Sequence, residues 1–272
     1  MEETEKVVRI ALLTEYDGTD FVGFQRQNNG RSVQEALENA IFEVYGRFCR
    51  IYGCSRTDSG VHAKGHVSHV DVPFAIPEDK IPFAINRFLP ADVAVLDAAI
   101  VSEDWHARFA SRGKRYVYAI HHAPIRSPLR ARTSAHVPGK LDIAAMSEAC
   151  QYFVGTHDFS AFRAQGGPDI SPIRTMKRVY IEEENHGEEV NIIVEGESFL
   201  YNMVRIMAGT IIYVGQGKLQ PTDVKDLLTG DERKNAGKTM PAHGLTLERV
   251  FYDNFLFGCQ KEEKIVLSEH QK

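Results

Sequence analysis

The sequence predicts an α+β protein made of two halves, each with a mixed-topology, mainly antiparallel sheet. Both halves show a strand, a helix, further strands and an additional helix, an order that suits this architecture. The 272 residues, 43% of them hydrophobic, suffice for one large domain or two ordinary ones with real cores. We expect an N-terminal half over residues 1–104, a C-terminal half over 105–258 and a surface tail over 259–272.

The N-terminal half begins with a strand over residues 7–16, a short apolar run that stops at the turn signal Asp17-Gly18. Ser32 and Glu35 form an S-x-x-E capping box. The apolar residues that follow recur at helical spacing, which predicts an amphipathic helix. The remaining elements expected in this half are strands over 50–53, 67–72 and 93–101 and a short helix over 81–88.

The C-terminal half begins with an alternating strand over residues 115–121. A helix over 141–153 follows, with Asp142 near its start and Gly155 after its end. The other elements expected here are paired strands over 177–183 and 190–197, a long apolar helix over 199–214, a short helix over 224–228 and a strand over 247–251.

Charge is distributed unevenly, although the formal net charge is only −5. The segment from Trp105 to Leu141, which we call the basic span, holds eight Lys and Arg residues and no Asp or Glu. A basic zone on an acidic body indicates a local polyanion site. The alternative is a solvated loop region whose charges cluster by chance.

The cellular compartment of the protein is inferred from the targeting signals that the sequence lacks. No run of about 18 apolar residues predicts a membrane span, and the acidic N-terminus MEETEKVVRI lacks the order of a secretion signal. The four cysteines form no CxxC pair. In a chain of this length we interpret them as reduced thiols of a cytoplasmic protein.

The stretch CSRTDSGVHA contains the first candidate for chemistry. Arg56 and Asp58 are two residues apart, so in an extended chain their side chains share a face. A nearby guanidinium favours the ionised carboxylate, and an ionised aspartate can act as a nucleophile or a base. Ser59-Gly60 allows a tight turn and close approach of a ligand. The alternative is a turn aspartate in a weak surface ion pair.

Arg205 is the only charged residue between Ser198 and Gly217, on a predicted helix that is apolar nearly all round. A buried arginine needs a partner anion, because an unpaired one costs several kcal/mol. That partner must come from elsewhere in the chain, and Asp58 is a candidate. Alternatively, the Arg205 side chain reaches solvent along its apolar stem.

Aromatic residues lie among the cations of the basic span. Tyr116 and Tyr118, next to Lys114 and Arg115, are two apart on a predicted strand and face one way. Rings beside cations are typical of proteins that stack unpaired bases. The alternative is that both rings belong to the core, and for one of them the core is the better interpretation. Arg163, in the loop FSAFRAQGG, either contacts RNA or lies in a simple connection.

Metal and nucleotide cofactors are not indicated. His62, His66 and His69 are candidate metal ligands. However, the side chains of His66 and His69 lie on opposite faces of a predicted strand. Glycines around His62 discourage a helix, and no Cys or carboxylate pattern completes a zinc site. The phosphate-binding glycine motifs and the G-x-S-x-G elbow are absent from the sequence. We therefore expect neither a metal nor a cofactor.

Taken together, the motifs resemble the tRNA pseudouridine synthase A family. The opening YDGTDFVGFQRQ is similar to the family's Y-D-G-x-x-F-x-G-W-Q-x-Q, and SRTDSGVHA to its G-R-T-D-A-G-V-H-A motif. The later blocks SVQEALENA, KRYVY, DFSAFR, MVRIMAGT and GLTLERV resemble family blocks in the same order. Departures are mild: Phe24 replaces a Trp, Ser55 a Gly and Ser59 an Ala.

The resemblance implies the pseudouridine synthase fold, in which two ferredoxin-like halves join their sheets around a central cleft. It implies isomerisation of uridine to pseudouridine at positions 38, 39 and 40 in the anticodon arm of tRNA, without a cofactor, by a homodimer. Asp58 is then the nucleophile, Tyr116 stacks on the target base and Arg205 pairs with Asp58. Arg56 holds the flipped nucleotide, and Leu245 is an apolar contact beneath the site. We place Lys114, Arg115 and Arg163 among the substrate-binding residues.

Three other functions stay open from the sequence. An RNA-binding protein without catalysis would keep the basic span and Tyr116 but would not need Asp58 with Arg205. A metal-dependent hydrolase would use the histidines. A synthase of the same chemistry with another RNA target would keep every residue named above.

Overall fold

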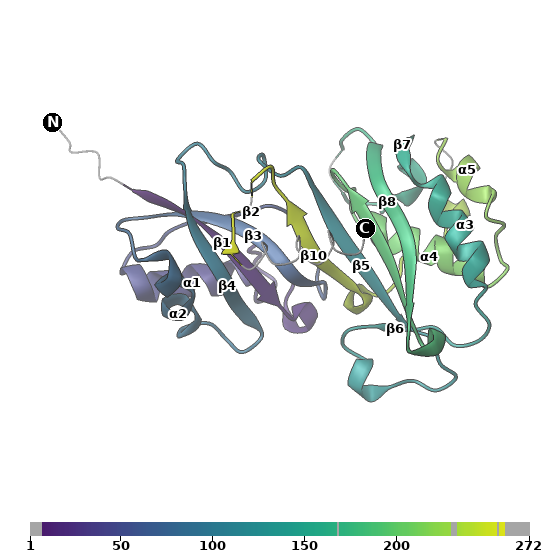
Figure 1. Ribbon diagram of the computed structural model, residues 1–272, viewed down its shortest axis with the longest axis horizontal. Coiled ribbons are helices and arrows are strands. Elements are labelled where there is room, and N and C mark those ends of the chain that lie inside the picture. Colours follow the sequence, from purple (N-terminus) through teal and green to yellow (C-terminus); the bar gives the residue numbers. More distant parts are fainter. Residues whose placement is uncertain (1–6, 168, 230–232, 255, 259–272) are drawn as a thin grey trace, which may run out of the picture. The chain divides into compact units, whose positions relative to one another are not determined.

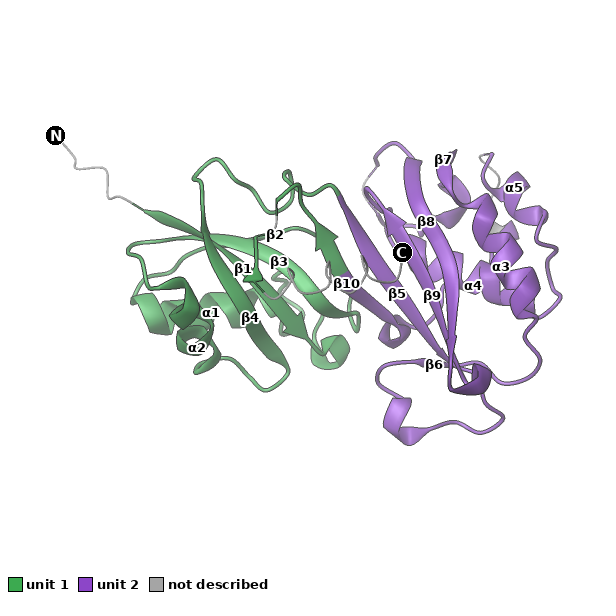
Figure 2. Ribbon diagram, in the orientation of Figure 1, with its two compact units in different colours: residues 1–112, 249–272 green, residues 113–248 purple. Residues whose placement is uncertain are grey.

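The computed structural model describes residues 7–167, 169–229, 233–254 and 256–258 and divides the chain into two units. Unit 1 combines the chain up to Arg112 with the chain from Arg249 onward, and unit 2 spans Gly113–Glu248 (Figure 2). Each unit carries antiparallel strands and helices, so the predicted α+β class is confirmed. The predicted tail over 259–272 lies outside the described residues.

The elements follow the predicted order closely (Figure 1). The strands are β1 (Val8–Tyr16), β2 (Ile51–Gly53), β3 (His62–Val72), β4 (Val93–Val101), β5 (Gly113–His121), β6 (Ala135–His136), β7 (Gly155–Asp158), β8 (Ile173–Glu184), β9 (Glu189–Gly196) and β10 (Leu245–Phe251). The helices are α1 (Val33–Tyr45), α2 (Ile81–Asn86), α3 (Ile143–Tyr152), α4 (Met203–Gly215) and α5 (Asp223–Leu227).

In unit 1, β1 is the central strand of its sheet. It pairs antiparallel with β3 on one side and with β4 on the other, and β2 adds to β3. Residues 10–13 of β1 are all buried, so both faces of the strand are covered. Helix α1 begins as predicted, because the Ser32 hydroxyl accepts a hydrogen bond from Glu35 N at 3.3 Å. It ends at Gly46, whose φ of 67° is a left-handed cap.

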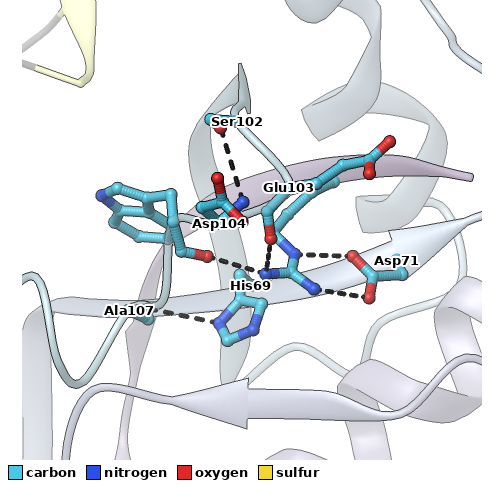
Figure 3. Close-up of polar contacts among 8 residues, drawn as sticks. His69, Asp71, Ser102, Glu103, Asp104 and Ala107 are labelled. Atoms are coloured by element: carbon cyan, nitrogen blue, oxygen red, sulfur yellow. Dashed lines mark hydrogen bonds and ion pairs between the residues drawn. The ribbon is translucent and has the colours of Figure 1, made fainter.

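Arg9 on β1 fixes the segment that follows β4 in unit 1 (Figure 3). Its Nε and Nη2 donate to the two carboxylate oxygens of Asp71 at 2.7 and 2.8 Å. Its Nη1 donates to the backbone oxygens of Glu103 and Trp105. These hydrogen bonds hold residues 102–107 against the sheet of unit 1, and the guanidinium holds the pKa of the Asp71 carboxyl below its usual range.

In unit 2, the strands lie in the order β5-β9-β8-β7, all antiparallel, and β6 pairs parallel with β5. Helices α3 and α4 pack together beside this sheet (Figure 1). Asp142 caps α3 by accepting from Ala145 N at 3.0 Å. Helix α4 begins at Met203, four residues after the predicted start, because Asn202 adopts a left-handed conformation with φ of 58°.

Cys49, Cys54 and Cys150 are buried free thiols, as predicted, and Cys259 lies outside the described residues. Burial raises the pKa of the Cys150 thiol to about 12, so that thiol is inert at neutral pH. None of the described helices is long and apolar enough to cross a membrane.

Candidate active site

The loop that carries Asp58 is fixed by hydrogen bonds to the loop that follows β1. We call these the Asp58 loop (residues 54–61) and the N-terminal loop (residues 17–24). Gly23 and Asp58 lie opposite each other in an isolated antiparallel bridge, to which the hydrogen bond from Phe24 N to Thr57 O (3.2 Å) belongs. Two further hydrogen bonds join the loops: Gly60 N to Phe21 O (3.3 Å) and Ser59 Oγ to Phe21 O (3.2 Å).

Two glycines of the N-terminal loop allow this close approach. A Cβ on Gly18 would lie 2.0 Å from the Val61 carbonyl oxygen, and one on Gly23 would lie 2.6 Å from that of Thr57. Gly23 also has φ of 117°, a conformation that side chains disfavour. The glycines of YDGTDFVG therefore let the two backbones touch, which sets the position of Asp58 in unit 1.

Buried polar side chains support the same loop. The Tyr16 and Thr57 hydroxyls are hydrogen-bonded at 2.8 Å. His62 Nδ1 accepts from Gly18 N at 3.0 Å. These contacts fix the backbone on both sides of Asp58, so Asp58 lies in a rigid turn. Its side chain is half-buried, and that of Arg56 is exposed.

The other two histidines of the motif also have structural partners. His66 stacks on Phe24 with ring centroids 4.0 Å apart, and its Nε2 lies 3.0 Å from Ser55 O. His69 Nδ1 accepts from Ala107 N at 3.3 Å (Figure 3). In the described part of the chain, no three His, Cys, Asp or Glu side chains are grouped so that they could hold a metal ion.

Tyr116 lies on β5 in unit 2 and is only 6% exposed. The edge of its ring meets Phe199 at 5.0 Å between centroids, nearly perpendicular. Tyr118 is buried as well, and its hydroxyl donates to Pro241 O at 3.0 Å. Lys114 and Leu245 are also buried in this unit.

Arg205 lies on α4 in unit 2 and is half-buried. Its Nε donates to Met240 O at 2.7 Å, and its Nη1 donates to Asn202 Oδ1 at 2.6 Å. These two neutral acceptors help to fix the plane of the guanidinium. The pairing of Arg205 with Asp58, which lies in unit 1, stays a prediction.

Two of the predicted substrate-binding cations contact carboxylates. Arg115 lies 2.8 Å from Glu195 and 3.4 Å from Glu248. Arg163 donates to Ile170 O at 3.3 Å and lies 3.8 Å from an exposed Asp169 carboxylate. Sequence reasoning missed Glu195 and Glu248 because they are 80 and 133 positions from Arg115 in the chain.

Comparison with known proteins gives one consistent result. The family model described as tRNA pseudouridine synthase matches residues 12–110 and 149–253. The tRNA pseudouridine synthase A of Ruminiclostridium cellulolyticum is 44% identical over 246 residues, covering 90% of this chain and 99% of that protein. The protein of the same name from Syntrophotalea carbinolica is 46% identical over 243 residues, covering 89% and 96%.

Proposed function

The chain belongs to the tRNA pseudouridine synthase family, and on that premise we propose that it converts uridine to pseudouridine at positions 38, 39 and 40 of the tRNA anticodon arm. In this isomerisation the bond from uracil N1 to the ribose breaks and a bond from uracil C5 to the same ribose carbon forms. The C5 hydrogen leaves to solvent and N1 gains a proton, so no oxidant, reductant or cofactor is consumed.

Asp58 is the nucleophile in this proposal. The supporting observation is its place on a loop whose backbone is hydrogen-bonded on both sides of it, while the residue itself is half-buried. An ionised aspartate attacks the nucleotide at the sugar or at the base ring and holds it while the uracil turns. A rigid support makes this attack efficient, because misplacement by about 1 Å can cost about 100-fold in rate.

The remaining residues keep the base and the charge in place. Tyr116 stacks on the loosened uracil and Leu245 closes the apolar side, so that the base does not escape. Arg205 stabilises the charge of Asp58. A duplex hides the target base, so the nucleotide is flipped out at a cost of a few kcal/mol, and Arg56 holds it there. Cations, Lys114 among them, bind backbone phosphates, and this binding offsets the free-energy cost of flipping.

The direct test is Asp58→Asn, which keeps the size of the side chain and removes its charge. With tRNA labelled by tritium at uracil C5, we expect the variant to bind tRNA and to release no tritium. Asp79→Asn, at an exposed aspartate beside Lys80, is the matched control and should release tritium like the wild type. Normal release by Asp58→Asn would contradict the assigned role.

The target is tested with tRNA transcripts that carry a single uridine at 38, 39 or 40. The wild-type protein should modify all three transcripts. If it modifies none of them but does modify another RNA, the proposed tRNA target is wrong. Lack of any tritium release by the wild type would favour an RNA-binding protein without catalysis. We also propose that the protein is a homodimer and acts in the cytoplasm. Light scattering would measure the mass of the protein in solution and so test the dimer.

A further inference from the structure

Unit 2 contains a pocket that the proposed reaction does not use. Its volume is about 480 Å³, within the range of sites that hold small molecules or parts of larger ligands. Three segments form its walls: the loop between β5 and β6, the C-terminal end of α4 and residues 238–243. Tyr213 and Ile212 supply an aromatic and an apolar wall.

The lining of this pocket is strongly cationic. Arg126, Lys218 and Lys238 are exposed at its edge, and Arg130 lines it while paired with Glu189. No Asp or Glu lines the pocket among the residues that the structure describes. Cations gathered over a concave surface without a lining carboxylate favour an anionic ligand.

His121 fixes the strand side of the pocket. It lines the pocket and is only 7% exposed. Its Nε2 lies 3.2 Å from Ile125 O, so the imidazole ties the end of β5 to the loop that carries Arg126 and Arg130.

The wall that carries Lys238 is fixed on α4. A Cβ on Gly209 would lie 1.9 Å from the Lys238 carbonyl oxygen, so the segment lies directly on the helix backbone. Gly237 N donates to the buried Thr210 hydroxyl at 2.9 Å. The cation is therefore attached to a rigid backbone, which lowers the ordering cost of binding.

We propose that this pocket binds one phosphate of the substrate RNA, away from the nucleotide that reacts. The inference rests on the proposed function. His121 lies five residues along β5 from Tyr116, which corresponds to about 16 Å at the rise of a strand, and this odd spacing turns the two side chains to opposite faces of the strand. RNA whose flipped base lies at Tyr116 therefore reaches the pocket by passing around the end of β5, several nucleotides away.

The test compares two pairs of lysines in the full-length protein. Lys218 lies 4.7 Å from the Tyr213 ring at the edge of the pocket, and Lys225 lies 4.7 Å from the Tyr152 ring away from it. The pocket variant Lys218→Ala/Lys238→Ala is therefore matched by Lys80→Ala/Lys225→Ala. Fluorescence anisotropy measures the Kd of labelled tRNA at several salt concentrations, and thermal unfolding checks that both variants fold.

We expect the pocket variant to weaken tRNA binding and to lower the slope of log Kd against log salt by about 1 for each phosphate that the protein no longer binds. The control should keep the wild-type slope. An unchanged slope in the pocket variant overturns the inference. A second arm titrates inorganic phosphate by phosphorus NMR, and phosphate binding at the pocket with unchanged tRNA binding also overturns it.

These outcomes are distinct from failure of the proposed function. If the wild type releases tritium from tRNA but the pocket variant binds tRNA like the control, only the pocket assignment fails. If the wild type releases none while the pocket variant still loses salt-dependent tRNA binding, the catalytic proposal fails and the pocket assignment stands.

Discussion

Substituting Gly18 by alanine tests whether contact between the two loops positions Asp58. The new Cβ would lie 2.0 Å from the Val61 carbonyl oxygen, whereas real Cβ contacts closer than 3.0 Å are essentially absent. The two backbones must therefore separate by about 1 Å, and Val61 N is itself bonded to Asp58 O. We expect about a 100-fold loss of turnover from such a displacement and about 1–3 kcal/mol of lost stability from overpacking.

The assay combines tritium release from tRNA with urea unfolding of the same sample. Gly46→Ala is the control, because Gly46 has φ of 67° but nothing within 4 Å of an added Cβ. That variant should lose about 1–2 kcal/mol of stability from backbone strain and keep wild-type turnover. The reasoning is refuted if Gly18→Ala turns over within about threefold of the wild type while it is folded.

Two further predictions concern the ionisable groups of unit 1. Burial, with His106 and Arg9 nearby, lowers the pKa of His69 to about 4. The unfolded chain binds more protons than the folded one between pH 4 and about 6.5, so stability falls as pH is lowered through that window, by roughly 2–3 kcal/mol. His69→Gln should flatten this part of the curve of unfolding free energy against pH, and an equal slope would contradict it. Asp253→Asn removes an exposed ion pair with Arg112, and we expect a melting temperature indistinguishable from the wild type even at low salt.

Helix caps and apolar periodicity are local signals, and they were sufficient for most elements. Ser32 and Asp142 cap the helices that follow them, and β4 covers the same residues as the predicted strand. Strands β6 and β7 escaped prediction because they are short and have no apolar alternation of their own. Pairing with a neighbouring strand, which is a tertiary property, makes them strands.

Candidates for site chemistry can be named where they lie in one short stretch and not where they are assembled from distant ones. SRTDSG makes Asp58 a candidate, because an arginine, an aspartate and a tight turn stand together there. The cations Lys218 and Lys238 gave no signal, since each is ordinary in its own segment and only the fold brings both to one pocket. The ion pair of Arg115 with Glu195 could not be predicted, because the two residues are 80 positions apart in the chain.

Unit 1 is assembled from the beginning and the end of the chain, and this dictates an order of events during synthesis. Arg112 N donates to Phe251 O at 2.8 Å, and the Tyr252 hydroxyl donates to Ala107 O at 2.6 Å. A ribosome delivers residues 113–248 before those partners emerge, so unit 2, which is continuous, can be finished first. The half that holds the proposed nucleophile matures last, and a nascent chain interrupted before residue 249 carries a complete second unit beside an incomplete first one.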